Sequence, residues 1–285
     1  MRAVSLAFLF AALALFPDSA VAGDARPRQI AAASGHVKAN DANRSRETYR
    51  GHYSDLSAVA YRTDFPEVAE GLRHQIDIVE SSGLSPRVLQ FFQTVPIVVD
   101  DLACVGNMMA PASGNPKPIM AGACYSRNVP ETMRDKRLDP LIWGDNEKVP
   151  ASLDPVTRAE LMRTGVVMYR PLALADKNRE RPVLLHELLH AYHDRGLPGG
   201  FGNPAIMAWF KQATEKKAYP ADAYLMTNEK EFFAVTASVF LSGKDGPVDR
   251  AQIRQAQPDY YNYLVWLFGF DPDRGSGVSP VASAN

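Results

Sequence analysis

The segment from Pro182 to Gly196 constrains the fold most, because its leucines and alanine put apolar residues on nearly every face of any helix it forms. Pro182 is acceptable in the first turn of a helix, and Gly196 is a typical residue at its end. A helix that is apolar all round must be buried. Burial of polar side chains requires partners. The segment carries three such side chains, His186, Glu187 and His190.

The spacing of these three residues predicts a Zn²⁺ site. Side chains four residues apart lie on one face of a helix, so His186 and His190 can direct imidazole nitrogens at one ion. Glu187 is offset by about 100° around the helix, which puts its carboxylate beside the metal as a proton acceptor. The alternative is a chance pattern on a core helix, and the chain has only six histidines to produce it.

A catalytic zinc commonly has three protein ligands and one open position, so a third ligand is expected elsewhere in the chain. The metzincin pattern would continue with a glycine and a third histidine, but His193 and Gly196 occupy those positions. The other arrangement takes a glutamate from a later helix. Residues 224–241 are predicted to form that helix.

Two glutamates in this helix compete for the third ligand position. Glu229 and Glu231 lie about 200° apart around a helix, so only one can face the metal. We favour Glu231, because Glu229 falls in the first turn, where a solvated carboxylate suits the helix dipole. The alternative for Glu231 is a capping box with Asn228, which has the right spacing.

The run from Tyr224 to Ala234, YLMTNEKEFFA, resembles the third-ligand segment of the anthrax lethal factor-like zinc metallopeptidases. The resemblance implies that Glu231 binds zinc and that Tyr224 stabilises or protonates the tetrahedral intermediate. It further implies a gluzincin-type, zincin-like fold, in which an antiparallel edge strand aligns a substrate peptide beside the zinc. The strand expected at 166–172 is the candidate for that edge.

Two polar residues follow the motif on the same helix. His193 is expected to be a solvated histidine near the helix C-terminus, with a contact to substrate or to a ligand as the alternative. Asp194 could orient a ligand imidazole through its second nitrogen, although it too can be a surface residue.

The beginning of the chain predicts export. Residues 1–22 have a basic residue, a short apolar run and a small-residue site ending at Ala22, which together are typical of a Sec-type signal peptide. The protein is therefore expected in the periplasm or outside the cell, without a stable membrane anchor. Two cysteines remain, Cys104 and Cys124, and in an oxidising compartment they are expected to form a disulfide.

The rest of the chain predicts one α+β domain. Residues 23–54 and 274–285 are polar and aperiodic, so we expect a flexible arm and tail around a catalytic domain at 55–273. A net charge of −1 without a dense basic stretch gives no basis for nucleic-acid binding. Further helices are expected at 64–83, from residue 85, at 203–216 and at 251–268, the last with a break at Pro258. Strands are expected at 95–99, 119–125 and 166–172.

These features together predict an exported zinc-dependent endopeptidase whose partner is a peptide or protein substrate. Two alternatives remain at this point. One is a zinc hydrolase that acts on a non-peptide bond. The other is a binding protein built on a catalytically degenerate peptidase domain, against which the presence of Glu187 and Tyr224 counts.

Overall fold

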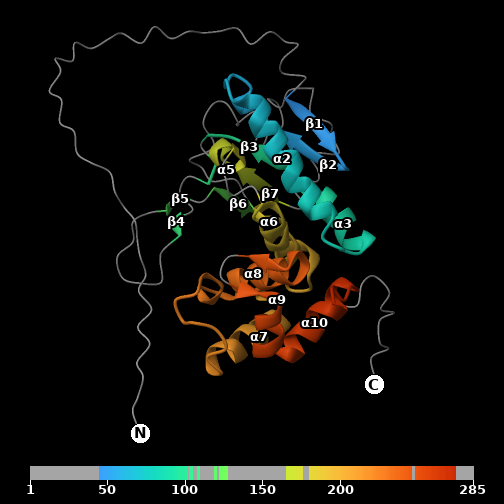
Figure 1. Ribbon diagram of the computed structural model, residues 1–285, viewed down its shortest axis with the longest axis vertical. Helices are drawn as coiled ribbons and strands as arrows, with labels where there is room; N and C mark the ends of the chain where they lie inside the picture. The colour runs from blue at the N-terminus through green and yellow to red at the C-terminus, as the bar shows by residue number, and fades with distance from the viewer. Residues whose placement is uncertain are drawn as a thin grey trace, which may run out of the picture. The chain divides into compact units, whose positions relative to one another are not determined.

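The computed structural model describes residues 45–101, 103–104, 108–109, 119–120, 122–127, 165–175, 180–245 and 248–273. These residues form a mixed α/β structure, with a small sheet in the first half and mostly helices in the second (Figure 1). The predicted signal peptide, most of the predicted arm and the tail at 274–285 lie outside the described residues.

The main sheet has five strands and is mixed in direction. The strand order is β1-β2-β3-β7-β6. The β1–β2 and β6–β7 pairs are antiparallel, whereas β2–β3 and β3–β7 are parallel. The five strands are β1 (Arg46–Tyr49), β2 (His52–Asp55), β3 (Ile97–Val99), β6 (Ala123–Ser126) and β7 (Val166–Tyr169).

Four short strands form two further antiparallel pairs. One pair joins β4 (Met108–Met109) to β5 (Ile119–Met120), and the other joins β8 (Lys244–Asp245) to β9 (Val248–Asp249). The second pair directly follows a helix that contributes to the site described below.

Two sequence predictions about this sheet were wrong. The sheet begins at Arg46, within the expected flexible arm, because Arg50 and Gly51 both have positive φ and close a tight hairpin there. The strand at 166–172 was expected at an edge, but β7 lies between β3 and β6. All four residues of β7 are buried, as a central strand requires, and β6 is the end strand beside it.

Among the described residues, two longer helices and one short helix accompany the main sheet. They are α2 (Phe65–Glu80), α3 (Pro86–Gln93) and α5 (Pro171–Ala175), and the first two confirm the predicted helices, each with proline in its first turn. The closest approach involves Gly71, where an added Cβ would lie 2.2 Å from the carbonyl oxygen of Leu174. Glycine is therefore required for α2 to pack against α5.

Five α-helices lie in the described part of the chain after residue 180, and they agree with the predicted helical segments. They are α6 (Val183–Ala191), α7 (Pro204–Glu215), α8 (Glu229–Ser242), α9 (Arg250–Ala256) and α10 (Pro258–Phe268). Helix α6 lies between the sheet and α8 (Figure 1), and almost all of its residues are buried. Among the helices that the structure describes, none is both long and apolar enough to cross a membrane.

Candidate metal centre

Helix α6 is held at its start by a buried glutamine from α2. The N-cap residue, Pro182, has no side chain that could cap the helix. Gln75 takes over this role, since its Oε1 accepts a hydrogen bond from the Leu184 N–H at 3.0 Å and its Nε2 donates to the Arg181 carbonyl at 2.9 Å. One side chain thereby satisfies backbone groups that the helix leaves open and fixes α6 against α2.

Three predicted ligand atoms converge on one point. Nε2 of His186 lies 3.1 Å from Nε2 of His190, and Oε2 of Glu231 lies 3.3 Å and 3.4 Å from these two nitrogens. Tetrahedral zinc with bonds of about 2.0–2.1 Å requires ligand atoms about 3.3–3.4 Å apart. The observed triangle therefore has the size of one face of a zinc coordination tetrahedron.

The Glu231 carboxylate reaches the histidines from the first turn of α8. The Asn228 side chain caps this helix by accepting hydrogen bonds from the N–H groups of Lys230 and Glu231. The side chain of Glu231 does not complete a capping box but turns toward α6. Its Oε2 is buried and accepts no hydrogen bond from any residue described. A buried carboxylate oxygen facing two imidazoles fits a metal ligand.

Mutual electrostatics favours the charged forms of Glu231 and His186. Burial opposes ionisation of Glu231, but the two histidines outweigh it and lower the pKa of this carboxyl group. Burial likewise opposes protonation of His186, yet the carboxylates of Glu231, Glu187 and Asp245 raise its pKa to about 8. The site thus attracts positive charge, whether a proton or a cation.

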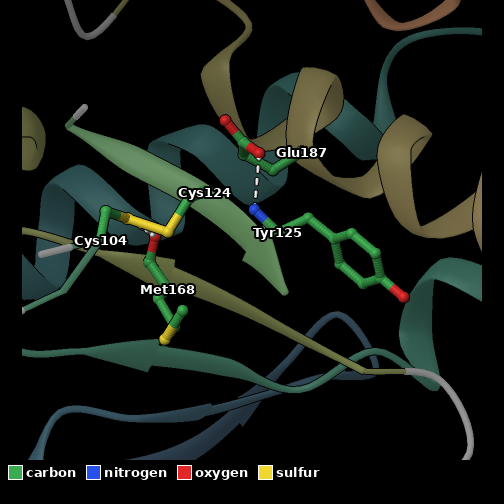
Figure 2. Close-up of a disulfide and its surroundings, with 5 residues drawn as sticks. All are labelled: Cys104, Cys124, Tyr125, Met168 and Glu187. Carbon is green, nitrogen blue, oxygen red and sulfur yellow. Dashed lines mark hydrogen bonds between the residues drawn. A yellow bond between two sulfur atoms is a disulfide. The ribbon is translucent and has the colours of Figure 1, made fainter. Parts of the chain in front are cut away.

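Glu187 lies beside this triangle and is held by the end strand of the sheet. Its Oε2 accepts a hydrogen bond of 2.8 Å from the backbone N–H of Tyr125 in β6 (Figure 2). Burial, reinforced by the negative charge of Glu231, raises the pKa of Glu187 despite the nearby histidines. A carboxylate with a raised pKa and a fixed orientation is suited to accept and return a proton.

The disulfide predicted from the sequence is present next to this contact. Cys104 and Cys124 are bonded, and Cys124 immediately precedes Tyr125 in β6 (Figure 2). The strand that contacts Glu187 is therefore covalently attached to the segment that follows β3.

Tyr224 is a partly exposed residue beside His186. It begins a 3-10 turn, Tyr224–Met226, just before α8, and its ring stacks on that of His186 with centroids 6.3 Å apart. The side chain is 42% exposed, so a substrate could reach it. Burial of part of the ring and the charge of Glu231 raise the pKa of Tyr224, which keeps its hydroxyl protonated as a donor.

The residues after the motif differ from prediction. Tyr192–Gly196 forms a π-helical turn, and His193 is fully buried in it rather than solvated. Its ring packs edge-on against those of Phe201 and Phe233, with ring centroids 5.3 Å and 5.0 Å apart. Burial lowers the pKa of His193 to about 4, so the ring is neutral at physiological pH. The prediction of a solvated His193 was therefore wrong, because the rings of Phe201 and Phe233 cover it.

Asp194 contacts β6 rather than a ligand histidine. Its carboxylate accepts hydrogen bonds from the Tyr125 hydroxyl at 2.9 Å and from Arg127, and it pairs with Arg195. The possibility that Asp194 orients a ligand imidazole is therefore wrong. It instead fastens the end of the motif helix to the end of the strand.

Sequence reasoning missed another carboxylate. Asp245 in β8 lies with its Oδ2 3.9 Å from Nδ1 of His186, the ring nitrogen that does not face Glu231. Asp245 stands in a Lys-Asp-Gly-Pro run that reads as an ordinary turn, so nothing in the sequence alone connects it with the motif.

Comparison with known proteins gave no relative: no family model, no curated protein and no solved structure matches this chain significantly. The site is accordingly interpreted from its own geometry, in which the five residues predicted from the sequence lie together. Among the described residues, His186, His190 and Glu231 form the one group of three or more side chains able to hold a metal ion.

Proposed function

We propose that this protein is an exported, zinc-dependent peptidase of the gluzincin type, similar to the anthrax lethal factor-like metallopeptidases. The observation that carries the proposal is the triangle of donor atoms from His186, His190 and Glu231, with sides of 3.1–3.4 Å. Glu187, whose pKa is raised by burial, and Tyr224, whose raised pKa keeps its hydroxyl protonated, stand beside it.

The donor set favours zinc over other common ions. Two imidazole nitrogens and one carboxylate oxygen are typical of catalytic zinc, whereas Ca²⁺ and Mg²⁺ prefer oxygen ligands. The three side chains are 10–19% exposed, so the site can be reached from solvent on one side. Three ligands also leave a fourth position for water or substrate.

The proposed chemistry is attack of water on a peptide carbonyl. Zinc, when bound, would lower the pKa of a coordinated water toward about 7 and polarise the carbonyl group. Glu187 takes the proton from the attacking water and passes it to the leaving amine, a task for which its raised pKa is suited. Tyr224 donates its hydroxyl proton in a hydrogen bond to the oxyanion that develops in the transition state.

Strand β6 supports a peptide as substrate. The Gly122 carbonyl accepts a hydrogen bond from Arg170 N–H, toward β7. In an antiparallel pair this direction alternates, so the backbone groups of Ala123 and Tyr125 point away from β7, and the Tyr125 N–H is the one that donates to Glu187. An extended peptide that pairs with the backbone of Ala123 would therefore lie beside β6, next to Glu187, held by main-chain hydrogen bonds. This geometry favours a peptidase over a hydrolase of non-peptide bonds.

Export is part of the proposal. The Cys104–Cys124 disulfide supports it, because structural disulfides persist mainly in oxidising compartments. Periplasmic and secreted locations both fit this argument.

The test starts with metal content. Purified protein should carry one zinc per chain, and Glu231→Ala should carry much less, whereas Glu229→Ala serves as a matched control in the same helical turn. Digestion of a diverse peptide library should then give products that vanish with a chelator and return with zinc. A well-folded protein that takes up no stoichiometric zinc would refute the proposal, and zinc binding without any peptide cleavage would refute the peptidase activity.

A further inference from the structure

Asp245 is a buried acidic residue whose position is tied to the motif helix. It lies in β8, three residues after the end of α8, and only 9% of it is exposed. Its two oxygens face different partners. Oδ2 lies 3.9 Å from Nδ1 of His186, and Oδ1 lies 3.5 Å from a guanidinium nitrogen of Arg181. Both partners belong to the beginning of α6 or to the residues just before it.

The chemistry of a metal-binding histidine requires such a neighbour. An imidazole that binds a metal through Nε2 keeps its proton on Nδ1, and an acceptor for this proton fixes the ring and increases its basicity. Nε2 of His186 faces His190 and Glu231, so Nδ1 is the outward nitrogen. Asp194, the other candidate for this role, is engaged by Tyr125 and Arg127.

We propose that Asp245 is a positioning residue that accepts a hydrogen bond from Nδ1 of His186 and so orients this ligand toward the metal. The inference rests on the proposed zinc site. The present 3.9 Å separation is about 1 Å longer than a hydrogen bond to a carboxylate, so the proposed bond requires one of the two side chains to rotate. The Arg181 side chain is 57% exposed, so it shields the buried carboxylate only in part.

Through Asp245, helix α8 would be linked to the ligand helix α6 at a second place besides Glu231. Helix α8 contributes Glu231 at its first turn and Asp245 just after its last residue. His186 is therefore approached from both ends of α8, by a ligand on one nitrogen and by an acceptor on the other. Substitution of Asp245 should loosen the ring without removing a ligand.

The experiment measures the affinity for Zn²⁺ alone, by competition with a chelator. Asp245→Asn keeps the size of the side chain and removes its charge, and loss of such an outer partner commonly weakens metal binding about 10–100-fold. Arg181→Gln removes the other partner of Asp245 and should leave zinc affinity close to the wild-type value. Asp245→Glu retains the charge and should bind zinc more tightly than Asp245→Asn. Absorption spectra of the Co²⁺-substituted proteins should show altered bands for Asp245→Asn but not for Arg181→Gln.

The outcomes separate this inference from the proposed function. Wild-type zinc affinity in Asp245→Asn would refute the role of Asp245 and leave the metal site standing. Equal losses of zinc affinity in Asp245→Asn and Arg181→Gln would also refute this role, because Asp245 would then act by holding the start of α6 through Arg181. Failure of the wild-type protein to bind zinc would refute the proposed function itself. If Asp245→Asn does not fold, Asp245→Glu against Asp245→Ala supplies the same comparison of charge.

Discussion

The affinity of the site for zinc should depend steeply on pH, because a proton and the metal compete for His186. The neighbouring carboxylates outweigh burial and raise the pKa of His186 to about 8 in the metal-free protein. Below this pH the ring is protonated and must release a proton before it can bind zinc. Zinc affinity should therefore increase as the pH rises and level off above 8.

The size of the expected change in zinc affinity follows from the fraction of His186 rings that is neutral at each pH. With a pKa of about 8, roughly one ring in a hundred is neutral at pH 6, about one in ten at pH 7 and about nine in ten at pH 9. The apparent affinity should thus rise about 100-fold from pH 6 to pH 9. A histidine with an ordinary pKa of about 6.5 would give only about a fourfold rise over the same range.

The assay is chelator competition at constant ionic strength, at unit intervals from pH 6 to pH 9, corrected for proton binding by the chelator. Glu229→Gln, which changes a charge outside the donor triangle, should retain the full slope. A rise of only a fewfold in the wild-type protein would refute the argument that the carboxylates around His186 dominate over its burial.

Three further predictions concern turnover and stability. Glu187→Gln should retain zinc but lower kcat by about 10²–10⁴, since it removes the proton acceptor; substantial residual turnover would contradict its role. Tyr224→Phe should lower kcat by about 10²–10³ with little change in KM or zinc content, measured by steady-state kinetics, and unchanged kcat would exclude it as an oxyanion donor. Replacement of both Cys104 and Cys124 by alanine should reduce the free energy of unfolding by about 3 kcal/mol and Tm by roughly 6–12 °C, because it frees a loop with a sequence separation of 20. Thermal unfolding with and without a reducing agent checks this value, and a Tm that neither change alters would contradict it.

The sequence alone predicted those parts of the candidate site whose polar residues are neighbours in one helix. His186 and His190 are four residues apart, so their spacing alone places them on one face of a helix, with Glu187 about 100° around from His186. The starts of the helices at Pro86, Pro204 and Pro258 were likewise predictable, because the effect of proline on the first turn of a helix is local. In these cases the residues that determine the structure are neighbours in the chain.

Contacts between distant segments could not be predicted in this way. The position of β6 at the end of the sheet depends on pairing between strands that are about 40 residues apart, and no local pattern reports strand order. Asp245 and Gln75 act on the motif helix from elsewhere in the chain. The burial of His193 was missed for the same reason, since Phe233, one of the two rings that cover it, is 40 residues away in the sequence.

The hydrogen bond from Tyr125 to Glu187 makes one backbone amide a reporter of the charge on the Glu187 carboxylate. The amide proton points directly at the oxygen whose charge changes when Glu187 gains a proton. Its NMR chemical shift should therefore follow the titration of this single side chain, without substrate or mutation. Addition of zinc, which brings positive charge nearby, should move that titration to lower pH. The ionisation of the proposed base can thus be observed separately from turnover.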